Sequence, residues 1–295
     1  MDERLRRLQE IEGVSGDEGR VADFLAETLA GVPGVAIRRV GDNLIVSRGR
    51  PRAAVLAHLD TVGFTLGYGR ELIRIGGPAT EGGEAVRSTV EGRTFRGRVE
   101  KGDDVWLLEG AAEAPPGSRW VWDAPLAQEG DTLTGAYLDN RAGVWCASRV
   151  VEVCPDVAVA FTVGEEHSGR GAMVCGRILH DEMGISQALI CDVTWHDGPV
   201  RRGGGAAISL RDRFLPRRTF LDRVMALAAE SGVPHQHEIQ SDGASDGAAI
   251  ERSGLPIDWC FVGPAQENPH SPHEAMQWSD LEATVALYTY LLHHL

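Results

Sequence analysis

The feature that most constrains this fold is an alternation of short apolar runs with longer segments of helical period. The apolar runs are rich in Val, Ile and Leu and too short for helices, which is typical of strands buried within a sheet. We expect strands at residues 43–47, 53–59, 157–163, 188–193, 206–210 and 257–262, and helices between 15 and 31 and at 140–153, 170–179, 218–231 and 281–293. Strands that alternate with helices predict an α/β fold, in which helices flank a mainly parallel sheet.

Two of the expected helices begin with a serine followed three residues later by a glutamate. These pairs are Ser15 with Glu18 and Ser279 with Glu282. The pattern is that of a capping box, in which the serine hydroxyl accepts a backbone N–H of the first turn. We therefore expect both serines to cap their helices.

The character of the sequence changes between residues 61 and 133. Glycines are frequent there, polar and apolar residues alternate at 94–99 and 104–108, and Pro115, Pro116 and Gly117 interrupt the pattern. Because no helical period is sustained, we expect a small β-rich domain at 63–134, inserted into an α/β domain made of residues 1–62 and 135–295.

Composition narrows the possible partners and the location. With 29 Lys plus Arg against 43 Asp plus Glu, the formal charge of -14 argues against binding to nucleic acids or to anionic membrane surfaces. Five scattered cysteines without a Cys-x-x-Cys pair are typical of buried thiols in a reducing compartment. The N-terminus is charged and no apolar run is long enough to span a bilayer, so we expect a cytoplasmic protein.

Acidic residues and histidines recur where the predicted strands end. In open α/β sheets, ligands bind outside the carboxyl ends of the strands. The residues at such positions are His58, Asp60, Asp139, Glu165, Glu166, Asp192 and His270. Each is weak evidence alone: a single histidine is more often structural, and Asp139 could simply cap the following helix. Five carboxylates crowded at one edge would repel one another, however, and bound cations are the economical explanation.

Two histidines with several carboxylates suit zinc, cobalt or manganese. One carboxylate could bridge two ions, each held further by one histidine and one carboxylate, which leaves room for a shared water. Such a water loses a proton near neutral pH while the ions polarise a substrate carbonyl. A nearby carboxylate that is not a ligand could carry the proton to a leaving amine. The residues therefore suit metal-assisted hydrolysis of amide bonds.

The sequence resembles the dinuclear metallo-aminopeptidases of the tetrahedral and glutamyl aminopeptidase type. Six segments match in the order of the family: AHLDTVGF, LDNRAGV, FTVGEEHSGRGA, ICDVTWHDGP, SDGAAIERSGLP and HSPHE. The resemblance implies an α/β domain with a β-rich domain inserted after the His-x-Asp strand. It also implies a hydrolase that removes N-terminal residues from peptides with two divalent ions, zinc or cobalt, and that forms a homo-oligomer, from a dimer up to a dodecamer.

The resemblance implies a role for each site residue. Asp139 would bridge the two ions, His58 and Asp192 would hold one ion, and Glu166 and His270 would hold the other.

Glu165 would be the general base, and Asp60 would hydrogen-bond His58 and fix its tautomer. His273 competes with His270, but the spacing H-S-P-x-E favours His270. Asp246 also matches a family position, although the cap of a helix beginning near Gly247 explains it equally well.

Other functions remain open. Thr61 stands where these aminopeptidases usually have an acidic residue, and the resulting HLDTV looks more like the related carboxypeptidases and N-acyl amino acid deacylases. In that group, however, the bridging aspartate follows soon after His-x-Asp, whereas here the insertion separates Asp60 from Asp139. A binding protein that lost its chemistry would lack a ligand or the base, and none is missing. A glycosidase would need paired carboxylates but neither histidine.

Overall fold

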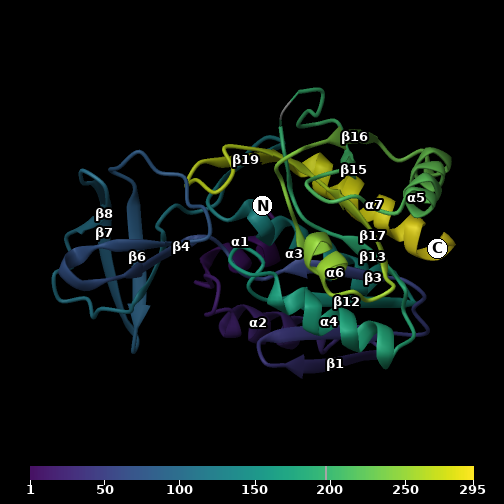
Figure 1. Cartoon of the computed structure of the whole chain (residues 1–295), viewed down its shortest axis with the longest axis horizontal. Coiled ribbons are helices and arrows are strands. Elements are labelled where there is room, and N and C mark those ends of the chain that lie inside the picture. Colours follow the sequence, from purple (N-terminus) through teal and green to yellow (C-terminus); the bar gives the residue numbers. More distant parts are fainter. Residues whose placement is uncertain (197) are drawn as a thin grey trace.

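The computed structural model describes residues 1–196 and 198–295. A large α/β body carries a smaller lobe of strands that projects from one end (Figure 1). The lobe is formed by residues between β3 and α3, and the C-terminus lies at the opposite end of the body. This organisation confirms the predicted fold class.

The body contains an eight-stranded sheet. In spatial order its strands are β1 (Val35–Val40), β2 (Asn43–Arg48), β12 (Val157–Thr162), β3 (Ala54–His58), β13 (Gln187–Ile190), β17 (Asp258–Gly263), β15 (Ala206–Arg211) and β16 (His235–Ile239). The four central strands, β12, β3, β13 and β17, are parallel, whereas β1, β2 and β15 introduce antiparallel pairings. The parallel core brings the carboxyl ends of these four strands to one edge.

Helices cover both faces of this sheet. One face packs against α1 (Glu3–Glu10), α2 (Gly19–Leu29), α3 (Leu138–Val153), α5 (Arg218–Ser231) and α7 (Trp278–His294), and the other against α4 (Arg170–Asp181) and α6 (Asp246–Arg252). Strand β3 contacts both helix layers. Val55 and Ala57 face the first layer, and Ala54 and Leu56 face the second. Burial on both faces explains why its sequence is continuously apolar.

The capping-box predictions are wrong. Helix α2 begins only at Gly19, and Ser15 instead donates its hydroxyl hydrogen to Asp60 over 2.6 Å. Helix α7 begins at Trp278, so Ser279 lies inside the first turn and donates to Asp131. In both cases the serine hydroxyl donates to an aspartate distant in the sequence instead of capping its own helix.

The lobe has its own six-stranded sheet. Its strands lie in the order β5 (Leu72–Ile75), β4 (Gly63–Leu66), β9 (Arg119–Trp122), β6 (Ala85–Val90), β7 (Arg93–Lys101) and β8 (Trp106–Glu109), and a short 3-10 helix, η1, covers Tyr68–Arg70. Phe64 and Trp122 meet edge to face, with ring centroids 5.2 Å apart, in a core separate from that of the body. The lobe therefore buries an apolar core of its own.

A third sheet joins lobe and body. It consists of β10 (Ala127–Glu129), β11 (Thr132–Gly135), β19 (Glu274–Gln277), β18 (Ala265–Glu267) and β14 (Thr194–Trp195). The last strand of the lobe's own sheet along the chain ends at Trp122. Strands β10 and β11 lie within or at the end of the 63–134 stretch, but they pair with each other and, through β11, with β19. The domain boundary at 134 stays a prediction.

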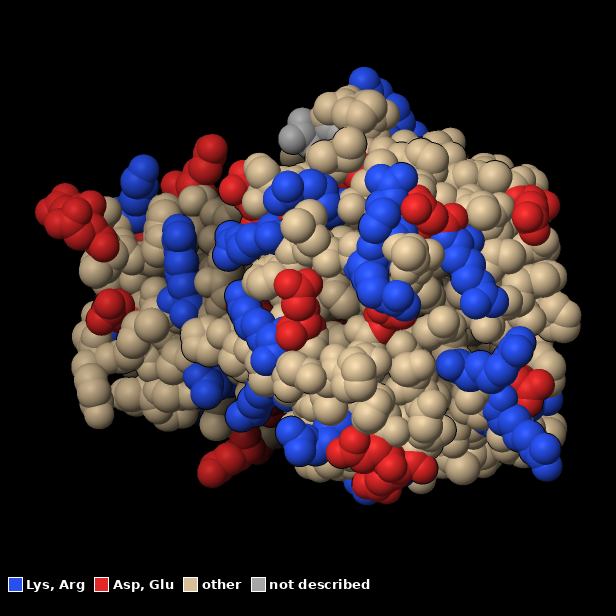
Figure 2. Space-filling view, turned by 45° about the vertical axis from the view of Figure 1, so that its right-hand side comes forward, with Lys and Arg blue, Asp and Glu red and all other residues tan. Residues whose placement is uncertain are grey.

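The described residues contain no helix long and apolar enough to cross a membrane. On the face drawn in Figure 2, basic and acidic side chains are interspersed, so the excess of negative charge does not form one broad patch there.

The end of β17 packs against the backbone that carries Asp192. A methyl group at Gly263 would lie 1.6 Å from the Asp192 carbonyl oxygen, whereas a methyl group at Gly31 would meet no heavy atom within 4 Å. We predict that Gly263→Ala lowers the free energy of unfolding by about 3 kcal/mol because the backbone must move. Gly31→Ala, the control, should stay within about 0.5 kcal/mol. Urea denaturation of both variants measures this, and equal stabilities would contradict the prediction.

Candidate metal centre

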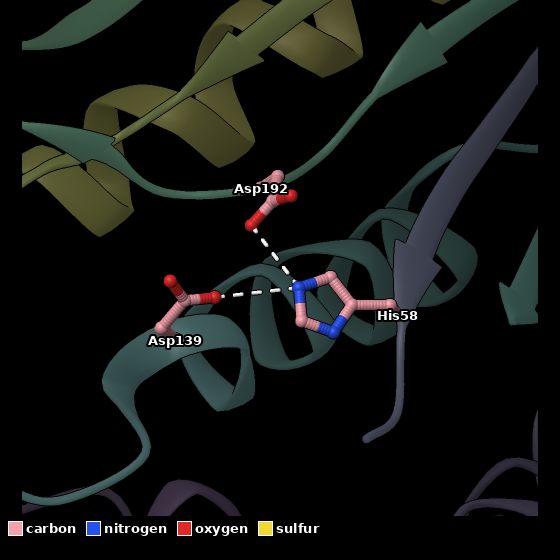
Figure 3. Close-up of side chains that lie close together, drawn as sticks. All are labelled: His58, Asp139 and Asp192. Atoms are coloured by element: carbon pink, nitrogen blue, oxygen red, sulfur yellow. Dashed lines mark ion pairs between the residues drawn. The ribbon is translucent and has the colours of Figure 1, made fainter. Parts of the chain in front are cut away.

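His58 lies at the end of β3 and faces two carboxylates. Its Nε2 atom is 3.3 Å from Asp139 Oδ1 and 3.4 Å from Asp192 Oδ1. Asp139 comes from the first turn of α3 and Asp192 follows β13, so three elements converge on one imidazole nitrogen (Figure 3). All three side chains are buried.

His270 forms a second group of the same kind. It lies between β18 and β19, and its Nε2 atom is 3.5 Å from Asp139 Oδ2 and 3.4 Å from Glu166 Oε2. The backbone of His270 has a φ of 61°, which is uncommon for a residue with a Cβ and directs this side chain from a tight loop. Asp139 thus presents one carboxylate oxygen to each histidine.

The neighbours of both histidines determine which ring nitrogen is free. The Nδ1 atom of His58 is 3.1 Å from the Asp60 carbonyl oxygen, and that of His270 is 3.2 Å from the Gly77 carbonyl oxygen. A carbonyl oxygen only accepts hydrogen bonds, so each Nδ1 must carry a hydrogen. In the neutral ring, Nε2 is then the lone-pair nitrogen that a metal requires, and both Nε2 atoms face the carboxylates.

Asp139 is held by residues far away in the sequence. Its backbone N–H donates to Glu274 Oε2 over 3.1 Å, and the Gln266 side-chain amide donates to Asp139 Oδ2 over 3.3 Å. Both partners are buried and belong to β18 and β19 of the connecting sheet. These contacts orient the carboxylate so that its two oxygens point to different sides.

Asp60 lies behind the histidine rather than in the cavity. Its Oδ1 accepts the Glu165 N–H over 3.0 Å, and its Oδ2 accepts the Glu166 N–H over 3.1 Å together with the Ser15 hydroxyl. Its carboxylate is therefore 3.6 Å from His58 Nδ1, and the hydrogen bond to His58 comes from the Asp60 carbonyl instead. The expected contact with His58 exists, but the carboxylate chiefly orders the turn that carries the two glutamates.

Charge crowding shifts the pKa values of the group. Burial raises the pKa of Glu165 and Glu166 well above the usual range, and neighbouring carboxylates add to the effect. Burial alone would lower the pKa of the histidines, but Asp139 raises that of His270 to about 9, and Asp192 and Asp139 raise that of His58. The pKa of Asp139 is lowered despite burial because both histidines bond to it.

This donor set fits two divalent cations. His58, Asp139 and Asp192 place one ligand atom each within 4.8 Å of one another, and so do Asp139, Glu166 and His270. The buried Oε1 atom of Glu166 has no hydrogen-bond partner. Metal ions would replace the protons that the histidines carry and would satisfy this oxygen.

The structure thus brings together all five residues proposed as ligands, and Glu165 lines the same cavity of about 270 Å³. His273 and His167 are exposed and outside this cavity. Asp246 does not cap α6, because the Ser245 side chain accepts from the Gly247 N–H; Asp246 instead accepts a hydrogen bond from the buried Thr162.

Sequence reasoning missed three residues that support the centre: Ser15, Gln266 and Glu274. Glu274 could have been found, because it ends the segment HSPHE that includes His270. Ser15 was assigned to a helix cap, and Gln266 carried no signal because it lies outside the six matching segments.

Comparisons with known proteins find relatives of this chain. The family model of the M42 glutamyl aminopeptidases matches residues 110–287, more than half of the chain. FrvX of Escherichia coli (strain K12) is 25% identical over 308 residues, which cover 85% of this chain and 83% of FrvX.

Solved structures share the fold. The aminopeptidase APDkam598 from the archaeon Desulfurococcus kamchatkensis is 22% identical and superposes with a TM-score of 0.89 over 99% of this chain and 94% of its own. The TET1 peptidase of Pyrococcus horikoshii, which can assemble into a tetrahedron or a large octahedral shell, is 22% identical, with a TM-score of 0.86 over 99% of each chain.

Replacing Ser15 tests whether its hydrogen bond to Asp60 contributes to metal binding. We predict that Ser15→Ala lowers metal affinity roughly 10-fold or more, because Asp60 loses one of the donors that position it behind His58 and the two glutamates. Stability should fall by about 1–2 kcal/mol, since a buried hydrogen bond is lost. Ser279→Ala, at the exposed start of α7, is the matched control. Titration against a competing chelator measures affinity, and equal affinity in both variants would refute a supporting role.

Proposed function

Since the chain belongs to the M42 glutamyl aminopeptidase family and is a metal-dependent aminopeptidase, we propose that two divalent ions bind on either side of Asp139 and that Glu165 is the general base. The substrates are peptides, from which the N-terminal residue is removed. The family match favours this activity over the carboxypeptidase or N-acyl amino acid deacylase that Thr61 brought into consideration.

One observation carries the proposal: the two carboxylate oxygens of Asp139 face two separate histidine–carboxylate pairs. His58 and Asp192 are the further ligands of one ion, and Glu166 and His270 are those of the other. Nitrogen and oxygen ligands of this kind favour zinc or cobalt. When bound, the ions would acidify a water and polarise the peptide carbonyl.

Glu165 is suited to move the proton. It lines the cavity beside His58 and Asp192, and among the described residues no donor binds its carboxylate. Its raised pKa, caused mainly by burial and then by Asp192 and Glu166, lets the carboxyl hold a proton that it takes from water and passes to the leaving amine. Divalent ions nearby would favour the ionised carboxylate and lower this pKa toward the physiological range.

We also propose that the chain assembles into a homo-oligomer in the cytoplasm. The TET1 peptidase of Pyrococcus horikoshii forms closed shells, and the lobe of this chain exposes Tyr68 and Ile73, which are 89% and 50% accessible. Apolar side chains at such positions are suited to contact between subunits. All five cysteines are free and buried, as expected in a reducing compartment.

The role of Glu165 can be tested with Glu165→Gln. We expect kcat for an aminoacyl amide to fall roughly 10²–10⁴-fold, because the amide cannot accept a proton. The content of bound metal should stay unchanged, since Glu165 is not a proposed ligand. Glu27→Gln, on the exposed side of α2, controls for loss of an acidic residue. Undiminished turnover in Glu165→Gln would rule out its role as the base.

The two-ion arrangement predicts different losses for different ligands. We expect His270→Ala to reduce the metal content from two ions per chain to one, and Asp139→Asn to reduce it further, because Asp139 contributes to both groups. Elemental analysis after dialysis measures this. Chelation should inactivate the wild-type enzyme, and zinc or cobalt should restore it. Activity that persists in metal-free protein would contradict the mechanism.

A further inference from the structure

The cavity that contains the metal-centre residues continues along the edge of the main sheet. Its far wall is built from β15 and β16, which run parallel with Ser209 paired to Glu238. Asp212, just after β15, and Gln240, just after β16, line the same space. This end of the cavity is polar.

Glu238 is a buried acid without a cationic partner. It is only 3% exposed, and its carboxylate accepts a hydrogen bond from the Gln240 amide, which also donates to Thr194 over 2.9 Å. No lysine or arginine is among the described residues that line the cavity, and no ion pair of Glu238 is found there. A carboxylate is almost never buried in this way unless a cation or further donors satisfy it.

Ser209 gives a second, independent indication. Its hydroxyl is buried at 2% exposure, and it has no hydrogen-bond partner although it lines the cavity. The Ser209 side chain lies close to Glu238 and lowers the pKa of that carboxyl. An unsatisfied buried hydroxyl in the wall of a cavity indicates a bound partner that supplies the missing donor or acceptor.

The partner is not a third metal ion. Within the described part of the chain, the groups that could hold an ion are the two that share Asp139, and neither contains Glu238 or Asp212. A cationic group that pairs with Glu238 would therefore belong to an organic molecule. Peptides supply it in two side chains, the ammonium of lysine and the guanidinium of arginine.

The position of this wall relative to the metal centre indicates which part of the peptide it contacts. The scissile bond must lie at the metal-centre residues, so the first side chain of the peptide enters the remaining cavity. A single space of about 270 Å³ joins the two ends, and this volume is small for a ligand pocket and suits one residue. The Gln240 side-chain amide donates to both Glu238 and Thr194, and Thr194 is two residues after Asp192, so the two regions adjoin.

We propose that Glu238 and Ser209, with Asp212 nearby, bind the side chain of the N-terminal residue of the substrate, and that this residue is lysine or arginine. The proposal rests on the proposed function and adds its substrate class. The cationic group donates to the Glu238 carboxylate and to the Ser209 hydroxyl oxygen. Asp212 contributes mainly charge, because its Oδ1 already accepts the Phe214 N–H.

The same wall disfavours other residues. Burial raises the pKa of Glu238 to about 7 and that of Asp212 to about 6, and a cation beside them favours their ionised forms. An N-terminal glutamate, the residue in the family's name, would add a third carboxylate and be repelled. Leucine would leave Ser209 buried without a hydrogen-bond partner and Glu238 buried without a cation.

The test measures kcat/KM of the metal-loaded wild-type enzyme for the aminoacyl amides of lysine, arginine, leucine and glutamate, and for N-acetyl-lysine. We expect kcat/KM for lysine or arginine to exceed that for leucine at least 10-fold, with glutamate lowest. Free L-lysine should inhibit more strongly than free L-glutamate. Preference for leucine or glutamate would overturn the specificity while leaving the aminopeptidase intact. Hydrolysis of N-acetyl-lysine alone would overturn the proposed function as well.

Variants identify the residues responsible. Glu238→Gln should lower the ratio of kcat/KM for lysine to that for leucine at least 10-fold, and Ser209→Ala should lower it severalfold. Glu230→Gln, on the exposed side of α5, should leave this ratio unchanged. Thermal unfolding and metal content establish that each variant is folded. If Glu238→Gln does not fold, Ser209→Ala and the inhibition by free lysine and glutamate still test the assignment. An unchanged ratio of kcat/KM for lysine to that for leucine in the folded variants overturns it.

Discussion

The buried carboxylate of Asp60 is the contact on which the rest of the site depends. It accepts hydrogen bonds from Ser15 and from the N–H groups of Glu165 and Glu166, and so joins the N-terminal segment to the turn after β12. Burial alone would raise its pKa, but His58, Ser15 and Glu165 lower it, so the group remains charged. A charged acceptor with several donors holds its partners firmly, which is what a site assembled from separate segments requires.

The site concentrates negative charge that protein groups compensate only in part. The buried guanidinium of Arg141 lies near Asp60 and donates to the Leu59 carbonyl, but its pKa is lowered to about 10 because it is deeply buried. Protonated His58 and His270 balance further carboxylates in the metal-free chain. Metal ions would take over this balance and release those protons, so metal binding and protonation are coupled. The proposed basic substrate side chain extends the same principle to Glu238.

Much of the fold could be predicted because buried parallel strands carry a continuous apolar signal. Strands β3, β12, β13 and β17 were found for this reason, and so were the acidic and histidine residues at their ends. Strands β1 and β16 were missed because edge strands are partly exposed and mix polar with apolar residues. The two capping boxes were misread because a local pattern does not reveal a distant partner such as Asp60 or Asp131.

The sequence by itself determined the central strands, the family and the set of residues that meet at one edge of the sheet, because periodicity and motifs are local properties of the chain. Only the tertiary structure decided how these residues contact one another. It divided the two oxygens of Asp139 between two histidines, turned the Asp60 carboxylate toward two backbone N–H groups, and placed Ser209 beside Glu238. Such contacts join strands and turns far apart in the sequence, and their geometry exists only once the sheet has formed.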